Sequence, residues 1–88
     1  MRHRASPRFW ACYNALAAEV RQLADRCYGL LRQDPCHPSL HFKKVGRLWS
    51  VRVGIHYRAL AVESGPDIAW FWIGTHAEYD RLIGTLVS

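Results

Sequence analysis

Two arginines on either side of a short turn are the residues of this sequence best suited to bind a phosphate. Arg52 and Arg58 flank residues 54–56 within the strand-like stretch WSVRVGIHYRALAVE. The planar guanidinium reaches two phosphate oxygens at once and stays charged at any physiological pH. If the two strands pair antiparallel and both side chains point to the same face, the arginines lie close enough to share one phosphate.

A histidine and a tyrosine follow the next strand-like segment. His76 and Tyr79 are three residues apart, which puts them on one side of a helical turn. Cleavage of RNA without a metal needs a group that takes the proton from the 2′-hydroxyl, a donor to the departing 5′-oxygen and cations around the transition state. The sequence therefore predicts a catalytic set of Arg52, Arg58, His76 and Tyr79. A structural tyrosine is the alternative, because Tyr79 also has the spacing of a packed helix face.

Residues 35–62 are rich in cations and contain no acidic residue. This block and the net charge of +5 favour a nucleic acid, an anionic membrane surface or an acidic protein as the partner. We expect the RNA-binding side chains to be Lys43, Lys44, Arg47 and His41. Because Lys43 and Lys44 are neighbours in a strand, only one of them can point to the binding face.

A metal site is a weaker interpretation of the histidines and cysteines. Cys36, His37 and His41 are close in sequence, but only Cys27 offers a fourth ligand and the spacing matches no known zinc site. No glycine-rich phosphate loop is present, so we expect neither metal nor cofactor. The three cysteines, Cys12 included, are odd in number and irregularly spaced, which is typical of free thiols in a reducing compartment.

The composition describes one small folded domain, residues 1–88. Half of the residues are apolar and four are tryptophan, so the chain can form a hydrophobic core. No apolar run reaches the roughly 18 to 20 residues of a membrane span, and the basic start MRHRASPRFW lacks the apolar centre of a signal peptide. We therefore expect a cytoplasmic protein that makes no contact with a membrane.

Helical signals dominate the first half of the chain. Residues 1–5 could form a short edge strand, and Ser6 before Pro7 is a good helix start. Apolar residues then recur at helical spacing until the Asp-Pro step at 34–35, where the residue before proline is pushed out of the helical region. A turn near residues 15–18 would divide this segment into a helical hairpin.

Strand signals dominate the second half. From residue 40 the apolar period changes from 3.6 to 2, and four strands are predicted at residues 40–45, 48–53, 57–63 and 68–74. The connections are short and contain glycine, so neighbouring strands should be antiparallel. The last strand is apolar on both faces and should lie inside the sheet.

Helices followed by an antiparallel meander predict an α+β domain, with a helical hairpin packed on one face of a small, mainly antiparallel twisted sheet. In the second predicted strand, Val51 and Val53 alternate with Ser50 and Arg52. The valines should therefore face the helices. Ser50, Arg52 and Arg58 should lie on an uncovered, concave and basic face.

These residues resemble the RelE/ParE superfamily of bacterial type II toxins, in particular its ParE-like branch of small toxins. The resemblance covers almost the whole chain and is strongest over residues 38–83. It is carried by the order of the elements, by R-V-G-x-x-Y-R at residues 52–58, and by G-x-H at 74–76 with a tyrosine close behind. The resemblance implies a RelE/ParE-like fold and a cognate antitoxin protein as partner.

The resemblance leaves the target open. In RelE-like members it implies cleavage of mRNA on the ribosome, with Arg52 and Arg58 matching the strand cations, His76 the polar residue after the last strand and Tyr79 the C-terminal aromatic. In ParE-type members it implies inhibition of DNA gyrase, which needs no catalytic set. A non-toxic module that binds an antitoxin or nucleic acid is the third alternative.

Overall fold

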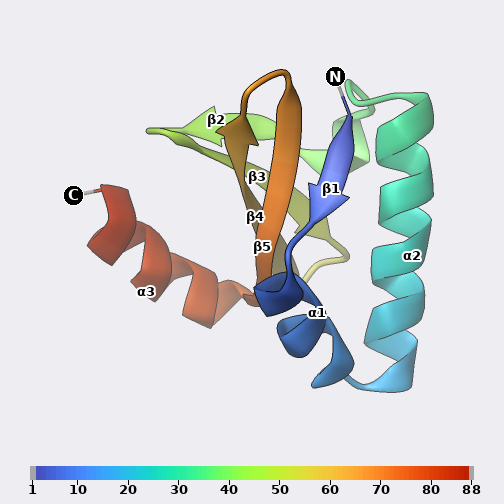
Figure 1. Cartoon of the computed structure of the whole chain (residues 1–88). Coiled ribbons are helices and arrows are strands. Elements are labelled where there is room, and N and C mark those ends of the chain that lie inside the picture. The colour runs from blue at the N-terminus through green and yellow to red at the C-terminus, as the bar shows by residue number, and fades with distance from the viewer. Residues whose placement is uncertain (1, 88) are drawn as a thin grey trace.

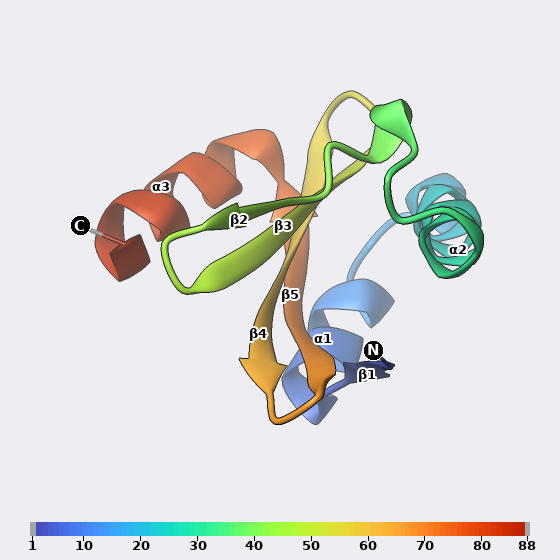
Figure 2. The same cartoon turned by 90° about the horizontal axis from the view of Figure 1, so that it is seen from above.

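The computed structural model describes residues 2–87 and has a five-stranded sheet with helices on both faces (Figures 1 and 2). Helices α1 and α2 pack on one face, and α3 packs on the other. In chain order the elements are β1 (His3–Ala5), α1 (Pro7–Asn14), α2 (Ala18–Gln33), the 3₁₀ turn η1 (Pro38–Leu40), β2 (Lys43–Val45), β3 (Leu48–Val53), β4 (Tyr57–Ser64), β5 (Asp67–Thr75) and α3 (His76–Val87).

The sheet has the strand order β1-β5-β4-β3-β2. Strand β1 runs parallel to β5, whereas the other three pairs are antiparallel. The predicted α+β class, the edge strand near the N-terminus and the inner position of β5 are therefore confirmed. Residue 1, which was part of the predicted edge strand, lies outside the described residues.

The first half forms the predicted helical hairpin. The Ser6 hydroxyl accepts a hydrogen bond from the Phe9 amide at 3.2 Å, and Pro7 occupies the first turn of α1. A three-residue break at 15–17 separates α1 from α2, and α2 ends one residue before the Asp-Pro step. In the described part of the chain, no helix has the length and the apolarity that a membrane span requires.

The first predicted strand is too long by three residues, because β2 begins only at Lys43. Pro38 starts a 3₁₀ turn that carries Leu40 into the core, where 1% of its surface remains exposed. His41 then takes a left-handed backbone conformation, with φ of 47°. This conformation is unfavourable by about 1 to 2 kcal/mol for a residue with a Cβ. Burial of Leu40 outweighs the local preference for a continued strand.

The expectation of an uncovered second face is wrong for most of its length. Ser50, which was predicted to be exposed to solvent, is only 2% exposed. Aliphatic and aromatic side chains of the sheet and α3 form a second cluster on this face, which includes Leu48, Leu60, Trp72, Tyr79, Leu82 and Ile83. Leu48 and Leu60 provide apolar surface on this face, and α3 packs against it. The alternation of residue types within β3 alone did not reveal that a helix covers this face.

A β-bulge decides which face each tryptophan of β5 occupies. Leu60 pairs with Trp72 and the next residue, Ala61, pairs with Trp70, so Phe71 is left as an extra residue. Leu60 and Ala61 point to opposite faces. Trp72 therefore packs under α3 while Trp70 packs under α1 and α2. Without the bulge, the two tryptophans would share one face.

Candidate active site

The sheet register brings the two predicted arginines together. Arg52 of β3 pairs directly with Arg58 of β4, on the face that carries α3. Residues opposed in this way have Cβ atoms about 4.5 to 5.5 Å apart, and like charges there repel. Arg52 Nε donates to the Gly54 carbonyl at 3.2 Å, and Arg58 Nη1 donates to the Tyr57 carbonyl at 2.9 Å. Backbone carbonyls thus hold both guanidinium groups in position.

The charge of this arginine pair is not neutralised within the described chain. No carboxylate of residues 2–87 forms a salt bridge with either arginine. Burial lowers the pKa of Arg58, and the neighbouring charge of Arg52 lowers it further, whereas Tyr79 and Asp80 of α3 act in the opposite direction. Two adjacent cations in a half-buried position favour an anion that would bridge them.

Hydrogen bonds hold the start of α3 at the end of the sheet that carries the arginine pair. The Thr75 amide and hydroxyl both donate to Glu78 Oε1 at 2.9 Å, and the Glu78 amide donates back to the Thr75 hydroxyl at 3.2 Å. This is a capping box, and its hydrogen bonds lower the pKa of Glu78. The His76 amide also donates to the His56 carbonyl in the β3–β4 turn at 2.7 Å. The first turn of α3 therefore lies beside the arginine pair.

His76 has a partner that the sequence analysis missed. Its Nδ1 lies 3.3 Å from Asp80 Oδ2, one helical turn further on. The His-x-x-x-Asp spacing was the available signal, since residues four apart in a helix are neighbours. A carboxylate on Nδ1 favours the tautomer that leaves Nε2 free to accept a proton. Both side chains are about half exposed, at 49% and 61%.

Tyr79 has a packed ring, and it also lies near His76 and Arg58. Its ring packs against the cluster of Leu60 and Trp72 under α3. It also lies 6.1 Å from the His76 ring, centroid to centroid, and it influences the pKa of Arg58. None of the side-chain hydrogen bonds among the described residues involves the phenol hydroxyl. The aromatic ring is structural, and the hydroxyl remains available for chemistry.

His41 reaches the arginine pair from the loop before β2. Its Nε2 lies 3.3 Å from Arg52 Nη1. Because the guanidinium can only donate, this hydrogen bond requires an unprotonated Nε2. The left-handed backbone of His41 is the only positive φ at a non-glycine residue among those described. Strained backbone of this kind is often found at functional sites.

The other predicted RNA-binding residues are spread over the sheet. Lys43 pairs with Ser50 and therefore lies on the face of Arg52. Lys44 lies on the opposite face, where its Nζ is 3.3 Å from Glu63 Oε1 and 5.9 Å from the centre of the Trp49 ring. The exposed Arg47 lies in the β2–β3 turn, about 16 Å from Arg52 along the strand.

The structure offers no group of metal ligands in its described part, where no three His, Cys, Asp or Glu side chains are clustered suitably. Cys27 of α2 packs on the opposite face of the sheet, with Sγ 3.7 Å from the backbone carbonyl oxygen of Arg52. Burial raises the pKa of this thiol. A raised pKa makes the reactive thiolate scarcer, so Cys27 is poorly suited as a nucleophile.

No family model matches the sequence, and no curated protein matches it. Solved structures do match. A chain of the RelB–RelE antitoxin–toxin complex from Methanococcus jannaschii is 16% identical, with a TM-score of 0.67, and the alignment covers 89% of this chain and 96% of that chain. The isolated RelE toxin of E. coli is 10% identical, with a TM-score of 0.62 and coverage of 97% and 98%. The YoeB/ParE toxin from Agrobacterium tumefaciens is 14% identical, with a TM-score of 0.63 and coverage of 86% and 99%.

The chain therefore has the same fold as the RelE and YoeB/ParE toxins, as the resemblance of its sequence led us to expect. Each of these alignments spans nearly the full length of the matched chain. At 10 to 16% identity the likeness establishes the fold and leaves the reaction to the residues of the site.

Proposed function

We propose that this protein is the toxin of a type II toxin–antitoxin pair and that it cleaves mRNA on the ribosome without a metal ion. The observation that carries the proposal is the Arg52–Arg58 pair, which has no carboxylate partner in the described chain and lies beside the first turn of α3. A pair of uncompensated arginines is unfavourable for folding alone. It is well suited to a bound phosphate.

In this proposal the arginines bind the scissile phosphate and stabilise the charge that develops on its oxygens. The guanidinium groups are already positioned by the Gly54 and Tyr57 carbonyls, so little reorganisation is needed when the transition state forms. His41 supports Arg52 by accepting from its Nη1. Lys43, exposed on the same face, would bind the RNA backbone beyond the scissile phosphate. Lys44 and Arg47 would make peripheral contacts.

Proton transfer is assigned to the first turn of α3. His76 Nε2 would take the proton from the 2′-hydroxyl, because Asp80 holds the opposite side of the imidazole. The Tyr79 hydroxyl would donate to the departing 5′-oxygen, with Arg58 beside it to stabilise the phenolate. Asp80 orients the imidazole and does not touch the substrate.

The proposed partners are a cognate antitoxin, the ribosome and mRNA, and the proposed location is the cytoplasm. The antitoxin is supported by the match to the RelB–RelE antitoxin–toxin complex. The ribosome and mRNA are supported by the basic face and the net charge of +5.

Inhibition of DNA gyrase is the second candidate function. It is favoured by the packing of the Tyr79 ring, which gives this residue a structural reason to be present without catalysis. The match to the YoeB/ParE toxin concerns the fold alone, so it supports gyrase inhibition as much as it supports RNA cleavage.

Induction of the wild-type protein in cells separates the two functions. If the protein is an endoribonuclease, primer extension finds new transcript ends within minutes and protein synthesis stops before plasmid supercoiling changes. If no cuts appear and relaxed plasmid accumulates, the ribonuclease assignment is wrong and gyrase is the target. Binding to ribosomes should also weaken steeply with salt, because counterions compete for the phosphates.

A further inference from the structure

His41 occupies a backbone position that suits glycine or asparagine better than histidine. It ends the 3₁₀ turn η1 with φ of 47° and ψ of 42°, and its amide donates to the Pro38 carbonyl at 3.3 Å. Left-handed residues of this kind commonly end helices, where glycine is the usual residue and asparagine the next. The His41 side chain is exposed, so burial of the imidazole does not offset the unfavourable conformation. Neither the backbone nor the core therefore accounts for a histidine at this position.

The register of the sheet places His41 beside the arginine pair. Lys43 opposes Ser50 in the β2–β3 ladder, so the same register continued by two residues puts residue 41 opposite Arg52. Residues opposed in this way project from the same face of a sheet. Arg52 Nη1 donates to His41 Nε2 at 3.3 Å, and Arg52 itself opposes Arg58. Three basic side chains therefore lie in a row across β4, β3 and the segment before β2, with Arg52 in the middle.

The contact with His41 fixes the orientation of the Arg52 guanidinium. The Gly54 carbonyl accepts from Nε at 3.2 Å and holds one edge of the group, and the imidazole accepts from Nη1 and fixes the rotation of the plane. Because His41 and Arg58 flank Arg52 on opposite sides, the imidazole attracts the guanidinium on the side away from the like charge. A guanidinium has five N–H donors, so three of them remain for an anion.

We propose that His41 is a positioning residue of the arginine pair and that it acts as an uncharged hydrogen-bond acceptor. The imidazole holds the guanidinium of Arg52 in a fixed orientation beside Arg58 before a phosphate binds. The unfavourable backbone persists at this position because glycine has no acceptor to offer and asparagine is too short to reach Arg52. The inference rests on the proposed function, which identifies the bound phosphate as that of mRNA.

The competing role for His41 is that of a cation that contacts the RNA backbone. That role needs a protonated imidazole, in which both nitrogens donate and neither can accept from Arg52. The protonated form would also bring a third positive charge to the row that contains Arg52 and Arg58. The observed contact therefore favours the uncharged role, and the two roles predict opposite results for His41→Gln.

Binding of inorganic phosphate to the purified protein tests the proposal without requiring RNA cleavage. The NMR signal of the Arg52 Nε–H group measures the affinity, and exchange between the Nη signals measures the rotation of the guanidinium. His41→Gln keeps an acceptor and loses the titratable ring, so it should bind phosphate within about twofold of the wild type and keep a slowly rotating Arg52. His41→Leu is of similar size and has no acceptor, so it should bind roughly three- to tenfold more weakly, with faster rotation.

Two outcomes of this titration overturn the proposal. If His41→Gln loses as much affinity as His41→Leu, the histidine acts through its charge. If His41→Leu binds phosphate as tightly as the wild type, the contact with Arg52 does not position the guanidinium.

Thermal unfolding of His41→Gly is the second test, because a residue retained for the site rather than for the fold should lower stability. Glycine takes a φ of 47° without strain, so this variant should unfold roughly 2 to 6 °C above the wild type while it binds phosphate as weakly as His41→Leu does. Lys43→Gly, in strand β2, is the matched control and should unfold at a lower temperature than the wild type. A lowered unfolding temperature of His41→Gly would show that the histidine serves the fold, which overturns the proposal.

RNA cleavage separates this inference from the proposed function. Absence of cleavage by the wild type, with the expected order of phosphate affinities intact, contradicts only the proposed function. Cleavage by the wild type that His41→Leu leaves unchanged contradicts only the positioning role of His41.

Discussion

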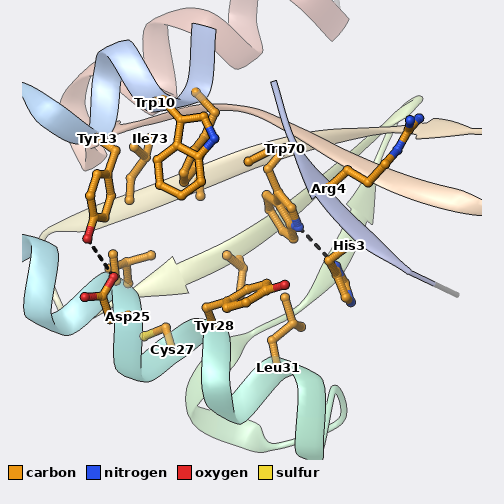
Figure 3. A pocket seen from close by; sticks show the side chains of 16 residues that line it. His3, Arg4, Trp10, Tyr13, Asp25, Cys27, Tyr28, Leu31, Trp70 and Ile73 are labelled. Carbon is orange, nitrogen blue, oxygen red and sulfur yellow. Dashed lines mark hydrogen bonds between the residues drawn. The ribbon is translucent and has the colours of Figure 1, made fainter. Parts of the chain in front are cut away.

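The two faces of the sheet use polar side chains in opposite ways. Under α3, the arginine pair has no acidic partner in the described chain. Under α1 and α2, the polar groups pair internally, as Tyr13 does with Asp25 and Trp70 does with His3 (Figure 3). The first arrangement favours an outside anion, whereas the second satisfies its polar groups within the fold. One sheet can serve both purposes because successive residues of a strand point to opposite faces.

The largest effect should come from Arg58→Ala. Removing an arginine that stabilises charge on a transferred phosphoryl group reduces rates by about 10³- to 10⁵-fold in other enzymes, and we expect a loss of that order together with loss of growth arrest. Primer extension and a growth assay measure the change, and circular dichroism checks the fold. Trp10→Ala on the other face should leave cleavage unchanged. A folded, fully toxic Arg58→Ala variant would exclude Arg58 from the site.

Tyr79→Phe should have the next largest effect on cleavage. The change removes the hydroxyl and keeps the ring that packs against the sheet. If the hydroxyl is the general acid, cleavage should fall by roughly 10²- to 10⁴-fold while RNA binding and thermal stability stay constant. Single-turnover cleavage of a defined mRNA on ribosomes measures the rate. Unchanged cleavage would reduce Tyr79 to a packing residue.

Gly74→Ala tests how tightly the α3 face is packed. A Cβ at Gly74 would lie 2.4 Å from Trp72 Cζ2 and 3.0 Å from Glu78 Oε1. The rigid indole cannot yield easily, so we expect a loss of about 1 to 3 kcal/mol in the free energy of unfolding. Gly29→Ala in α2 is the matched control. A Cβ there meets nothing within 4 Å, and the change should stabilise the helix by about 0.5 to 1 kcal/mol. Urea unfolding distinguishes the two.

Asp80→Asn should have a smaller effect on cleavage. Exposed ion pairs contribute up to about 1 kcal/mol, so the rate should fall by roughly fivefold. The ¹⁵N shifts of the His76 ring should show Nδ1 losing its share of the proton, which a purely structural role of Asp80 would not cause. An unchanged tautomer would remove Asp80 from the proposed mechanism.

The smallest effect concerns the capping box. The hydrogen bonds of the capping box lower the pKa of Glu78 in the folded protein below its unfolded value of 4.5. The carboxylate therefore contributes to stability above pH 4.5, and this contribution is lost as the pH falls through the pKa of the folded state. Glu78→Ala should therefore destabilise the protein at pH 7 by roughly 0.5 kcal/mol, and the difference should be lost at an acidic pH at which the carboxylate is protonated in the folded protein. Urea unfolding at the two pH values measures it. A difference that persists at low pH would contradict the assigned role of the carboxylate.

Local signals account for what was predicted correctly. Ser6 and Pro7 start a helix, and the Asp-Pro step ends one, through effects within a few residues. The pairing of Arg52 with Arg58 also followed from local information, because a short turn between antiparallel strands leaves little choice of register. The spacing of His76 and Tyr79 correctly placed the two rings near each other in the first turn of α3, whereas the contact of His76 with Asp80 was overlooked.

The sequence by itself determined the order of helices and strands, the helix ends, the turn registers and the concentration of positive charge. Only the tertiary structure decided that Ser50 is buried on the face that carries α3, that Lys44 pairs with Glu63 on the far face, and that the bulge at Phe71 sends Trp70 and Trp72 to opposite sides. The physical reason is the distance along the chain over which each interaction acts. Caps, turns and strand alternation act between neighbours, whereas the covering of a face depends on apolar area gathered from strands and helices far apart in the chain.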